Sequence, residues 1–177
     1  MVSIKHIVLF AAGVAALTIQ KRDFNKALTD LQTLDSNVNA FNTLVSGYQG
    51  GASYALSIYN QQTALDGQVN QCNSDAQAAL TGGTINSDQF NQLQTIVNTL
   101  STDLQIALST LKSKKLYFLL DSVINVLQLA LTTFASDTNN LSTNLVALCP
   151  AEDQAEAAAQ QAAINGYFTD CINWFSN

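Results

Sequence analysis

The longest hydrophobic pattern in the chain runs from Leu116 to Leu148. Apolar residues recur there at steps of four and three, which is the spacing of one stripe along an α-helix. In the first half of the run, further apolar side chains widen this stripe, so we expect other helices to surround it. Asp121, Asn125 and Gln128 interrupt the run and argue against a membrane span. We therefore interpret this stretch as the central helix of a bundle.

Four other segments show the same helical periodicity, and turn signals separate them. Glycines at 47–51 and 81–84 favour helix ends, and Pro150 disfavours helix at the residue before it. Asn86 and Gln89 have the spacing of a capping box, and a tight turn is expected near Ser113. The four segments are expected at about residues 23–47, 52–80, 87–113 and 151–177. The sequence thus predicts an all-α fold, an antiparallel bundle of about five long helices joined by short loops.

The first 22 residues have the pattern of a secretory signal peptide. Lys5 supplies a positive start, residues 7–17 an apolar core, and small residues follow at the expected cleavage region. The dibasic pair Lys21-Arg22 comes next and suits a processing protease of the secretory pathway. The alternative is an N-terminal membrane anchor, for which this apolar core is short. We expect residues 1–22 to be removed, which leaves a single binding domain over residues 23–177.

Charged residues are few in this chain, and acidic residues outnumber basic ones. Only 11% of residues are charged, against about 25% in a typical domain. The formal net charge is −6, and loss of residues 1–22 removes three basic residues and no acidic one. Four basic residues then face thirteen acidic ones, a net charge of −9. Such a charge opposes nucleic acids and anionic membranes as partners.

The distribution of chemically reactive residues argues against an enzyme. The only histidine, His6, leaves with the signal peptide. The usual general base and the commonest metal ligand are then missing. The acidic residues Glu152, Asp153 and Glu156 cluster where a helix is expected to start, and acids at that position complement the helix dipole. We therefore expect no catalytic residues, no metal site and no cofactor.

Export through the secretory pathway allows the cysteines to form disulfides and the single Asn-x-Ser acceptor to be glycosylated. With alternating helices, Cys72 and Cys149 fall near the same end of the bundle, whereas Cys171 falls near the other. We predict a Cys72–Cys149 disulfide and a buried free thiol at Cys171, because a disulfide requires neighbouring Cα atoms. Three unpaired cysteines are the alternative. Asn140 is the glycosylation acceptor, although its place within a helix is unusual for such a site.

The order of features along the chain resembles one known family. The residues that carry the likeness lie at helix ends and in the hydrophobic run: Tyr48–Gly51, Leu111–Phe118, Val126–Leu129, Leu145–Pro150 and Ile172–Phe175. In this order, and in its helix lengths, the chain is similar to the fungal hydrophobic surface-binding protein A family. That family includes the ligand-binding domains of fungal cell wall mannoproteins. The resemblance covers nearly the whole of residues 23–177.

The resemblance implies a secreted or wall-associated, non-enzymatic protein whose helices enclose a hydrophobic tunnel for a fatty acid. As an alternative, relatives adsorb to hydrophobic solids and help to recruit a secreted esterase. From the residues alone, the default interpretation of apolar seams is a solid core. The many alanines in these seams, such as Ala55, Ala76, Ala107 and Ala130, leave room between the helices.

The candidate ligand-binding residues are the larger seam positions of the five expected helices. They are Leu31, Val38, Phe41, Leu65, Val69, Phe90, Val97, Leu100, Leu104, Leu120, Val123, Leu127, Phe134, Ile164 and Phe168. The lysines near residue 114 form the only basic cluster, and we predict that Lys114 and Lys115 attract a ligand carboxylate at one mouth of the tunnel. The alternative for these lysines is a solvated helix end, where cations are favoured.

Overall fold

The computed structural model describes residues 4–176, with side chains described from Phe24 onward. This range folds into helices without strands: α1 (Ile4–Ser46), α2 (Ala52–Leu80), α3 (Ser87–Ser113), α4 (Lys115–Leu120), α5 (Ile124–Leu148) and α6 (Gln154–Ser176). The predicted all-α class is confirmed. No helix in the described part of the chain is long and apolar enough to cross a membrane. The predicted signal segment, residues 1–22, lies outside the described side chains, and its removal stays a prediction.

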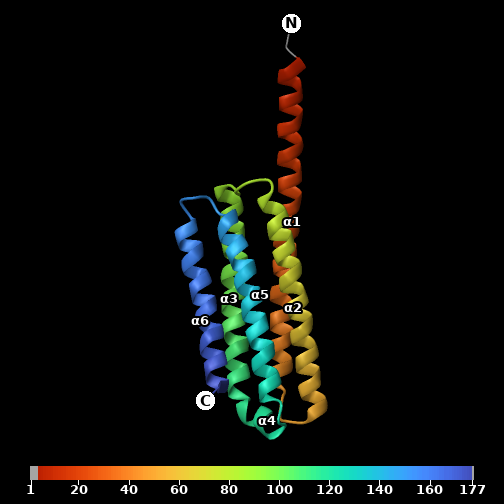
Figure 1. The fold of residues 1–177 in the computed structure, drawn as a ribbon, viewed down its shortest axis with the longest axis vertical. Helices are drawn as coiled ribbons and strands as arrows, with labels where there is room; N and C mark the ends of the chain where they lie inside the picture. The colour runs from red at the N-terminus through yellow and green to blue at the C-terminus, as the bar shows by residue number, and fades with distance from the viewer. Residues whose placement is uncertain (1–3, 177) are drawn as a thin grey trace.

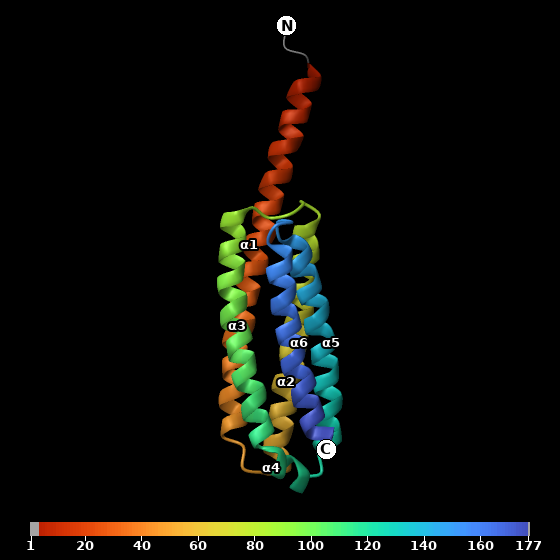
Figure 2. The same cartoon turned by 90° about the vertical axis from the view of Figure 1, so that its left-hand side faces the viewer.

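The five long helices form a closed ring in which each packs against two of the others (Figures 1 and 2). The order around the ring is α1, α2, α5, α6, α3 and back to α1. Because five is odd, strict alternation of helix direction cannot close this ring. The α2–α5 pair is parallel, as shown by Gln62 donating to the Ala130 carbonyl at 3.2 Å and Asn144 donating to Asn73 at 2.6 Å. No helix occupies the centre, so the prediction of a central rod was wrong.

The capping and turn signals of the sequence are confirmed at the ends of the helices. The Asn86 side chain accepts from the Gln89 amide at 2.9 Å, and the Gln89 side chain accepts from the Asn86 amide at 3.0 Å. These reciprocal bonds satisfy two amides at the start of α3. Gly50 and Gly51 have φ of 99° and 106°, a conformation that turns the chain from α1 into α2 without Cβ strain.

The hydrophobic run from residue 116 to 148 is two helices rather than one. The break falls between α4 and α5, where Ser122 has a φ of 60°. Next to it, the Asp121 carboxylate accepts the Gly51 amide at 2.6 Å and also accepts the Tyr48 hydroxyl. These bonds hold the α4–α5 junction against the α1–α2 turn. As a consequence, Leu120 is 71% exposed, and its predicted place inside the bundle was wrong.

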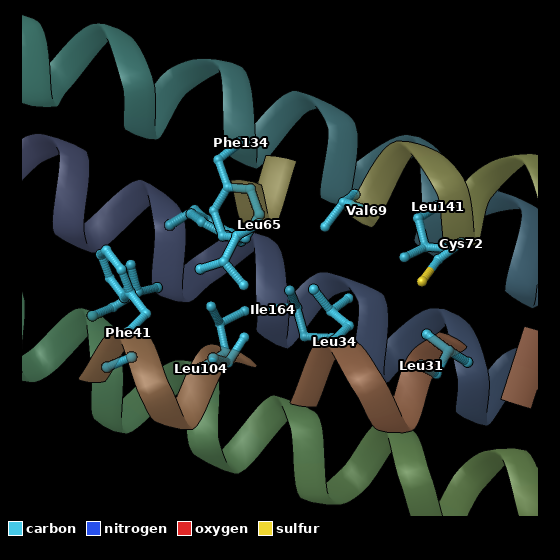
Figure 3. Close-up of a cluster of buried hydrophobic side chains, with 14 of the residues drawn as sticks. Leu31, Leu34, Phe41, Leu65, Val69, Cys72, Leu104, Phe134, Leu141 and Ile164 are labelled. Carbon is cyan, nitrogen blue, oxygen red and sulfur yellow. The ribbon is translucent and has the colours of Figure 1, made fainter. Parts of the chain in front are cut away.

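Side chains from every long helix form a core inside the ring. Figure 3 shows these side chains pointing toward one another across the interior. Aromatic pairs close the gaps, as where the Phe134 and Phe168 ring centroids lie 5.5 Å apart at 83°. Near α4, Tyr48 stacks on Phe118 with centroids 4.6 Å apart. Edge-to-face and offset pairs of this kind add about 0.5–1.5 kcal/mol each beyond their buried area.

Uncharged amides join neighbouring helices along their outer seams. Asn37 of α1 donates to Gln68 of α2 at 3.1 Å, and Gln160 of α6 donates to Asn98 of α3 at 2.5 Å. The Asn37–Gln68 pair is partly buried, and an amide pair there costs less desolvation than an ion pair in the same place. The low content of charged residues is therefore consistent with helices that are joined by amides.

Candidate functional site

The central cavity lies inside the ring, and all five long helices line it. Its volume is about 40 Å³. The lining side chains, mostly apolar, are Leu31, Leu34, Val38, Val69, Val97, Leu100, Ser101, Leu104, Phe134, Thr138, Leu141, Ser142, Leu145 and Ile164. A ring of five helices without a central one explains why space remains on the axis. The arrangement suits an elongated apolar ligand that lies along the helices.

A second cavity, the α6-side cavity, adjoins the first. It also measures about 40 Å³ and is lined by α3, α5, α6 and the residue after α5, with Phe90 and Leu93 on its apolar wall. Four residues line both cavities: Val97, Ser142, Leu145 and Ile164. We refer to these four side chains, which line both cavities, as the shared wall.

The third cavity, the α4-end cavity, lies where α2 and α5 meet α4. Its volume is about 30 Å³, and its lining is almost wholly apolar. The lining residues are Ala55, Ile58, Tyr59, Gln62, Phe118, Val123, Val126, Leu127 and Ala130. Two of them, Tyr59 and Val126, are also exposed on the outer surface. The α4-end cavity therefore lies close to the outer surface between α2 and α5, and it shares no lining residue with the central cavity.

Three hydroxyl groups line the central cavity in otherwise apolar surroundings. They belong to Ser101 of α3 and to Thr138 and Ser142 of α5, which are 8–9% exposed. Thr138 Oγ1 is buried and has no hydrogen-bond partner among the described residues. A buried hydroxyl left unsatisfied costs about 1–3 kcal/mol. The central cavity thus offers a polar group to an oxygen-bearing ligand.

The structure brings together most, but not all, of the residues predicted to line a tunnel. Eight line the central cavity: Leu31, Val38, Val69, Val97, Leu100, Leu104, Phe134 and Ile164. Phe90 lines the α6-side cavity, and Val123 and Leu127 line the α4-end cavity. Phe41, Leu65 and Phe168 are buried in the core without lining any of the three.

The sequence reasoning missed six residues of the central cavity. Leu34, Leu141 and Leu145 lie on the same apolar stripes as the predicted residues, at other positions along the same helices. The hydroxyl residues were missed because a polar side chain does not mark an apolar stripe. One feature of the sequence pointed to Thr138, which occupies the single gap in the apolar stripe between Phe134 and Leu141.

Lys114 and Lys115 lie on the outer surface at the α4 end and line none of the three cavities. Lys114 Nζ is 5.8 Å from the centroid of the Tyr117 ring. Lys115 Nζ is 5.7 Å from the Trp174 ring centroid and donates to the Trp174 carbonyl at 2.6 Å. Both ammonium groups thus have aromatic neighbours, and their predicted role as a carboxylate anchor stays a prediction.

The predicted Cys72–Cys149 disulfide is not formed, and all three cysteines are buried free thiols. The register of α2 and α5 explains this result. Asn144 donates a hydrogen bond to Asn73, so residues 72 and 143 lie at the same height along the axis of the two helices. Cys149 then lies six residues farther on, or about 9 Å along the axis, whereas a disulfide needs Cα atoms within about 7 Å. The prediction of a free buried thiol at Cys171 is confirmed.

The described residues show no arrangement that suits metal binding. No three His, Cys, Asp or Glu side chains from Phe24 onward gather closely enough to hold a metal ion. Asn140, the predicted glycosylation acceptor, is exposed on α5. Its modification stays a prediction.

The chemistry that the cavities support is the noncovalent binding of an apolar molecule.

Comparison with known proteins supports this interpretation of the fold. Residues 24–147 match the model of the family described as hydrophobic surface binding protein A. Among solved structures, Afmp4p in complex with palmitic acid has a TM-score of 0.82 and 21% identity, over 86% of this chain and 99% of that one. Ligand binding domain 2 of the Penicillium marneffei MP1 protein, complexed with arachidonic acids, has a TM-score of 0.77 and 19% identity, over 88% and 96%. At these identities the likeness establishes the fold alone.

Ligand binding domain 1 of the same MP1 protein, also complexed with arachidonic acids, has a TM-score of 0.79 and 15% identity. It aligns over 89% of this chain and 99% of its own. A search of curated proteins finds no match. The family match, by contrast, spans more than half of the chain and agrees with the resemblance found in the sequence. The chain therefore belongs to the hydrophobic surface binding protein A family.

Proposed function

We propose that this protein is a secreted, non-enzymatic carrier that holds a fatty acid or a similar apolar molecule inside its helix ring. The observation that carries the proposal is the central cavity, because all five long helices contribute apolar side chains to it. The solved relatives in complex with palmitic and arachidonic acids support it by analogy of fold.

The ligand enters by displacing side chains. The central and α6-side cavities, at about 40 Å³ each, are far smaller than the ~300–1,000 Å³ of typical small-molecule sites. Movement of the shared wall, chiefly Leu145 and Ile164, joins them into one longer channel. Burial of about fifteen methylenes contributes roughly 12 kcal/mol, and association costs of ~4–15 kcal/mol reduce this sum. Micromolar affinity is therefore attainable without a charged anchor.

The polar end of the ligand is placed by the hydroxyls of the central cavity. Thr138 Oγ1 lacks a partner in the described structure, and Ser101 and Ser142 line the same space. A ligand oxygen that bonds to Thr138 removes the cost of its unsatisfied hydroxyl. Lys114 and Lys115 are the alternative anchor, in which the carboxylate stays at the α4 end. Substitution of both lysines by alanine distinguishes the two, because only the surface anchor depends on them.

A second candidate function is adsorption to hydrophobic solids with recruitment of a secreted esterase. The exposed leucines of the α4 end favour the adsorption, since Leu116, Leu120 and Leu129 are 64%, 71% and 70% exposed. This function requires no internal ligand. It predicts loss of near-ultraviolet circular dichroism on adsorption, if the bundle opens at the interface.

The carrier function is tested by mass spectrometry of lipids extracted from the secreted protein, followed by titration with palmitate. A Val97→Phe variant places a larger side chain at the shared wall and is expected to lose binding. Ile96→Phe is the matched control, because Ile96 is also half-buried but lines none of the three cavities. Circular dichroism establishes that both variants fold. The absence of extracted lipid, together with no saturable palmitate binding, would overturn the proposal.

A further inference from the structure

The large exposed apolar side chains that the structure describes all lie at one end of the bundle. From Phe24 onward there are nine of them: Leu56, Tyr59, Ile106, Leu116, Leu119, Leu120, Val126, Leu129 and Trp174. Three belong to α4, and each of the others lies within seven residues of the helix terminus beside α4. Figure 1 shows this end, at which α4 lies and α6 ends. Single exposed apolar residues are ordinary, whereas a cluster of this kind marks an interaction site.

The same end holds most of the positive charge. Of the four lysines from Phe24 onward, Lys112, Lys114 and Lys115 lie there. The two side-chain carboxylates that the structure describes nearby, Asp121 and Asp170, already have partners. Asp121 accepts the Gly51 amide at 2.6 Å, and Asp170 pairs with Lys112 at 2.5 Å. Lys114 and Lys115 therefore remain for an anionic partner.

We propose that the α4 end, defined by these nine apolar residues and three lysines, docks onto anionic phospholipid bilayers. Leucines on a short helix, an exposed Trp and Tyr at its rim, and lysines among them are the combination that binds at the lipid–water interface. The ammonium groups lie beside aromatic rings, with Lys114 Nζ 5.8 Å from the Tyr117 centroid and Lys115 Nζ 5.7 Å from the Trp174 centroid, and neither forms an ion pair with a carboxylate of the described residues. The anionic headgroup supplies the complementary charge.

The negative charge of the whole chain does not prevent this docking. The acidic cluster Glu152, Asp153 and Glu156 lies at the opposite end of the bundle. The length of α6, roughly 33 Å by helix rise, separates it from the α4 end. The screening length is only about 8 Å at physiological ionic strength. The bilayer therefore responds mainly to the charge of the end that approaches it. Net charge alone, from which the sequence predicts no anionic membrane partner, does not describe this local distribution.

Docking also places a cavity against the lipid, and this part rests on the proposed carrier function. Tyr59 and Val126 belong both to the exposed apolar set and to the lining of the α4-end cavity. An acyl chain that leaves the bilayer between them passes from one apolar environment into another. The α4 end is thus inferred to be the portal through which the carrier exchanges ligand with membranes.

The emission of Trp174 provides the test, because it is the only tryptophan of the chain and is 52% exposed within the proposed surface. The protein is titrated with vesicles of phosphatidylcholine mixed with phosphatidylglycerol, and separately with vesicles of pure phosphatidylcholine. We expect a blue shift and co-sedimentation with the mixed vesicles. Leu116→Asp/Leu120→Asp should weaken vesicle binding by about tenfold or more per leucine. Lys114→Glu/Lys115→Glu should abolish the preference for anionic vesicles.

The control is Ala155→Asp/Ala159→Asp, which places the same two charges, four residues apart, on the exposed face of α6 away from α4. It should bind vesicles like the unchanged protein. Palmitate binding without vesicles is measured in parallel for the leucine variant and for the control, and it should not change in either. Intact palmitate binding with no vesicle binding by the unchanged protein would overturn the docking surface and leave the carrier function standing. Equal loss of vesicle binding in the control and in the leucine variant would also overturn it.

Discussion

The hydroxyl of Tyr48 donates a hydrogen bond to the carboxylate of Asp121, 73 residues farther along the chain. Tyr48 is fully buried just after α1, and Asp121 ends α4. Burial, followed by the hydrogen bond and the charge of Asp121, raises the pKa of Tyr48 well above its usual value. The same carboxylate accepts the Gly51 amide at 2.6 Å. This contact fixes the end of the ring at which the chain turns into α5.

We expect Tyr48→Phe to destabilise the protein by about 1.5–3 kcal/mol, the range for hydrogen bonds to charged groups. The phenyl ring preserves the packing on Phe118, so the change isolates the hydroxyl. Urea unfolding followed by circular dichroism measures the effect. Tyr167→Phe is the control, since no hydrogen bond of its half-buried side chain occurs in the described structure. Equal effects of the two substitutions would refute a special role for the Tyr48–Asp121 bond.

Much of the fold follows from the sequence, because local signals determine the ends of most helices. The predicted bounds of α2 and the cap at Asn86 match the structure. The break after Leu120 was missed because the four-three periodicity continues through it. Its cause is long-range, since Asp121 is held by the α1–α2 turn. Periodicity also cannot determine how helices are ordered around an axis, and this order decides whether a central rod or a central cavity results.

The candidate site was predictable to the extent that it is apolar. The helical spacing of apolar residues such as Val69 and Ile164 shows that they face the core, whereas a polar residue such as Thr138 does not contribute to this pattern. The cysteines show a different limit. The height of Cys149 relative to Cys72 along the bundle axis depends on the register of α2 and α5. Asparagine contacts between these two parallel helices fix the register, and they form only in the folded protein.

Half-buried carboxylate pairs between helices should make the protein more stable in mild acid than at pH 7. Burial, and then the charge of Asp103, raises the pKa of Asp35, and burial with Asp137 does the same for Asp66. Each has a buried oxygen without a partner among the described residues. A raised pKa means that the folded state binds more protons, so stability is fully present below the unfolded value of about 3.9 and is lost as pH rises through the folded value.

Thermal unfolding from pH 7 down to about pH 4 measures this effect. We expect Asp35→Asn/Asp66→Asn to raise Tm at pH 7 and to flatten its pH dependence. Asp88→Asn, at an exposed position in the first turn of α3, should leave the dependence intact. The pKa of Asp75 is lowered, so its contribution is lost only in stronger acid. A Tm that falls steadily from pH 7 to pH 4 would contradict the prediction.

The three thiols should be unreactive in the folded protein and fully available after unfolding. Burial raises the pKa of Cys72 and of Cys171 to about 12 and that of Cys149 to about 11. Because the thiolate is the reactive form, a disulfide-exchange reagent at pH 8 should label none of them quickly. In guanidinium chloride without reductant, all three should react. If only one thiol reacts after unfolding, two of the cysteines are joined.

Thr138→Val should act in opposite directions on stability and on ligand binding. The substitution keeps the shape of the side chain and removes a hydroxyl without a partner, so the protein without added ligand should gain about 1–3 kcal/mol. Palmitate affinity, measured by displacement of a fluorescent fatty acid, should fall. Thr132→Val is the control, because the exposed Thr132 hydroxyl already bonds to the Gln128 carbonyl at 2.8 Å. Unchanged affinity in the Thr138 variant would show that the ligand oxygen binds elsewhere.

The most direct test of the internal site is the position of a bound acyl chain relative to the methyl groups of the protein. Intermolecular nuclear Overhauser effects from the terminal methyl of isotope-labelled palmitate report this position. We expect contacts to Val69, Leu145 and Ile164, which line the central cavity. Contacts confined to exposed methyl groups such as those of Leu120 and Leu129 would place the ligand on the surface and contradict binding inside the helix ring.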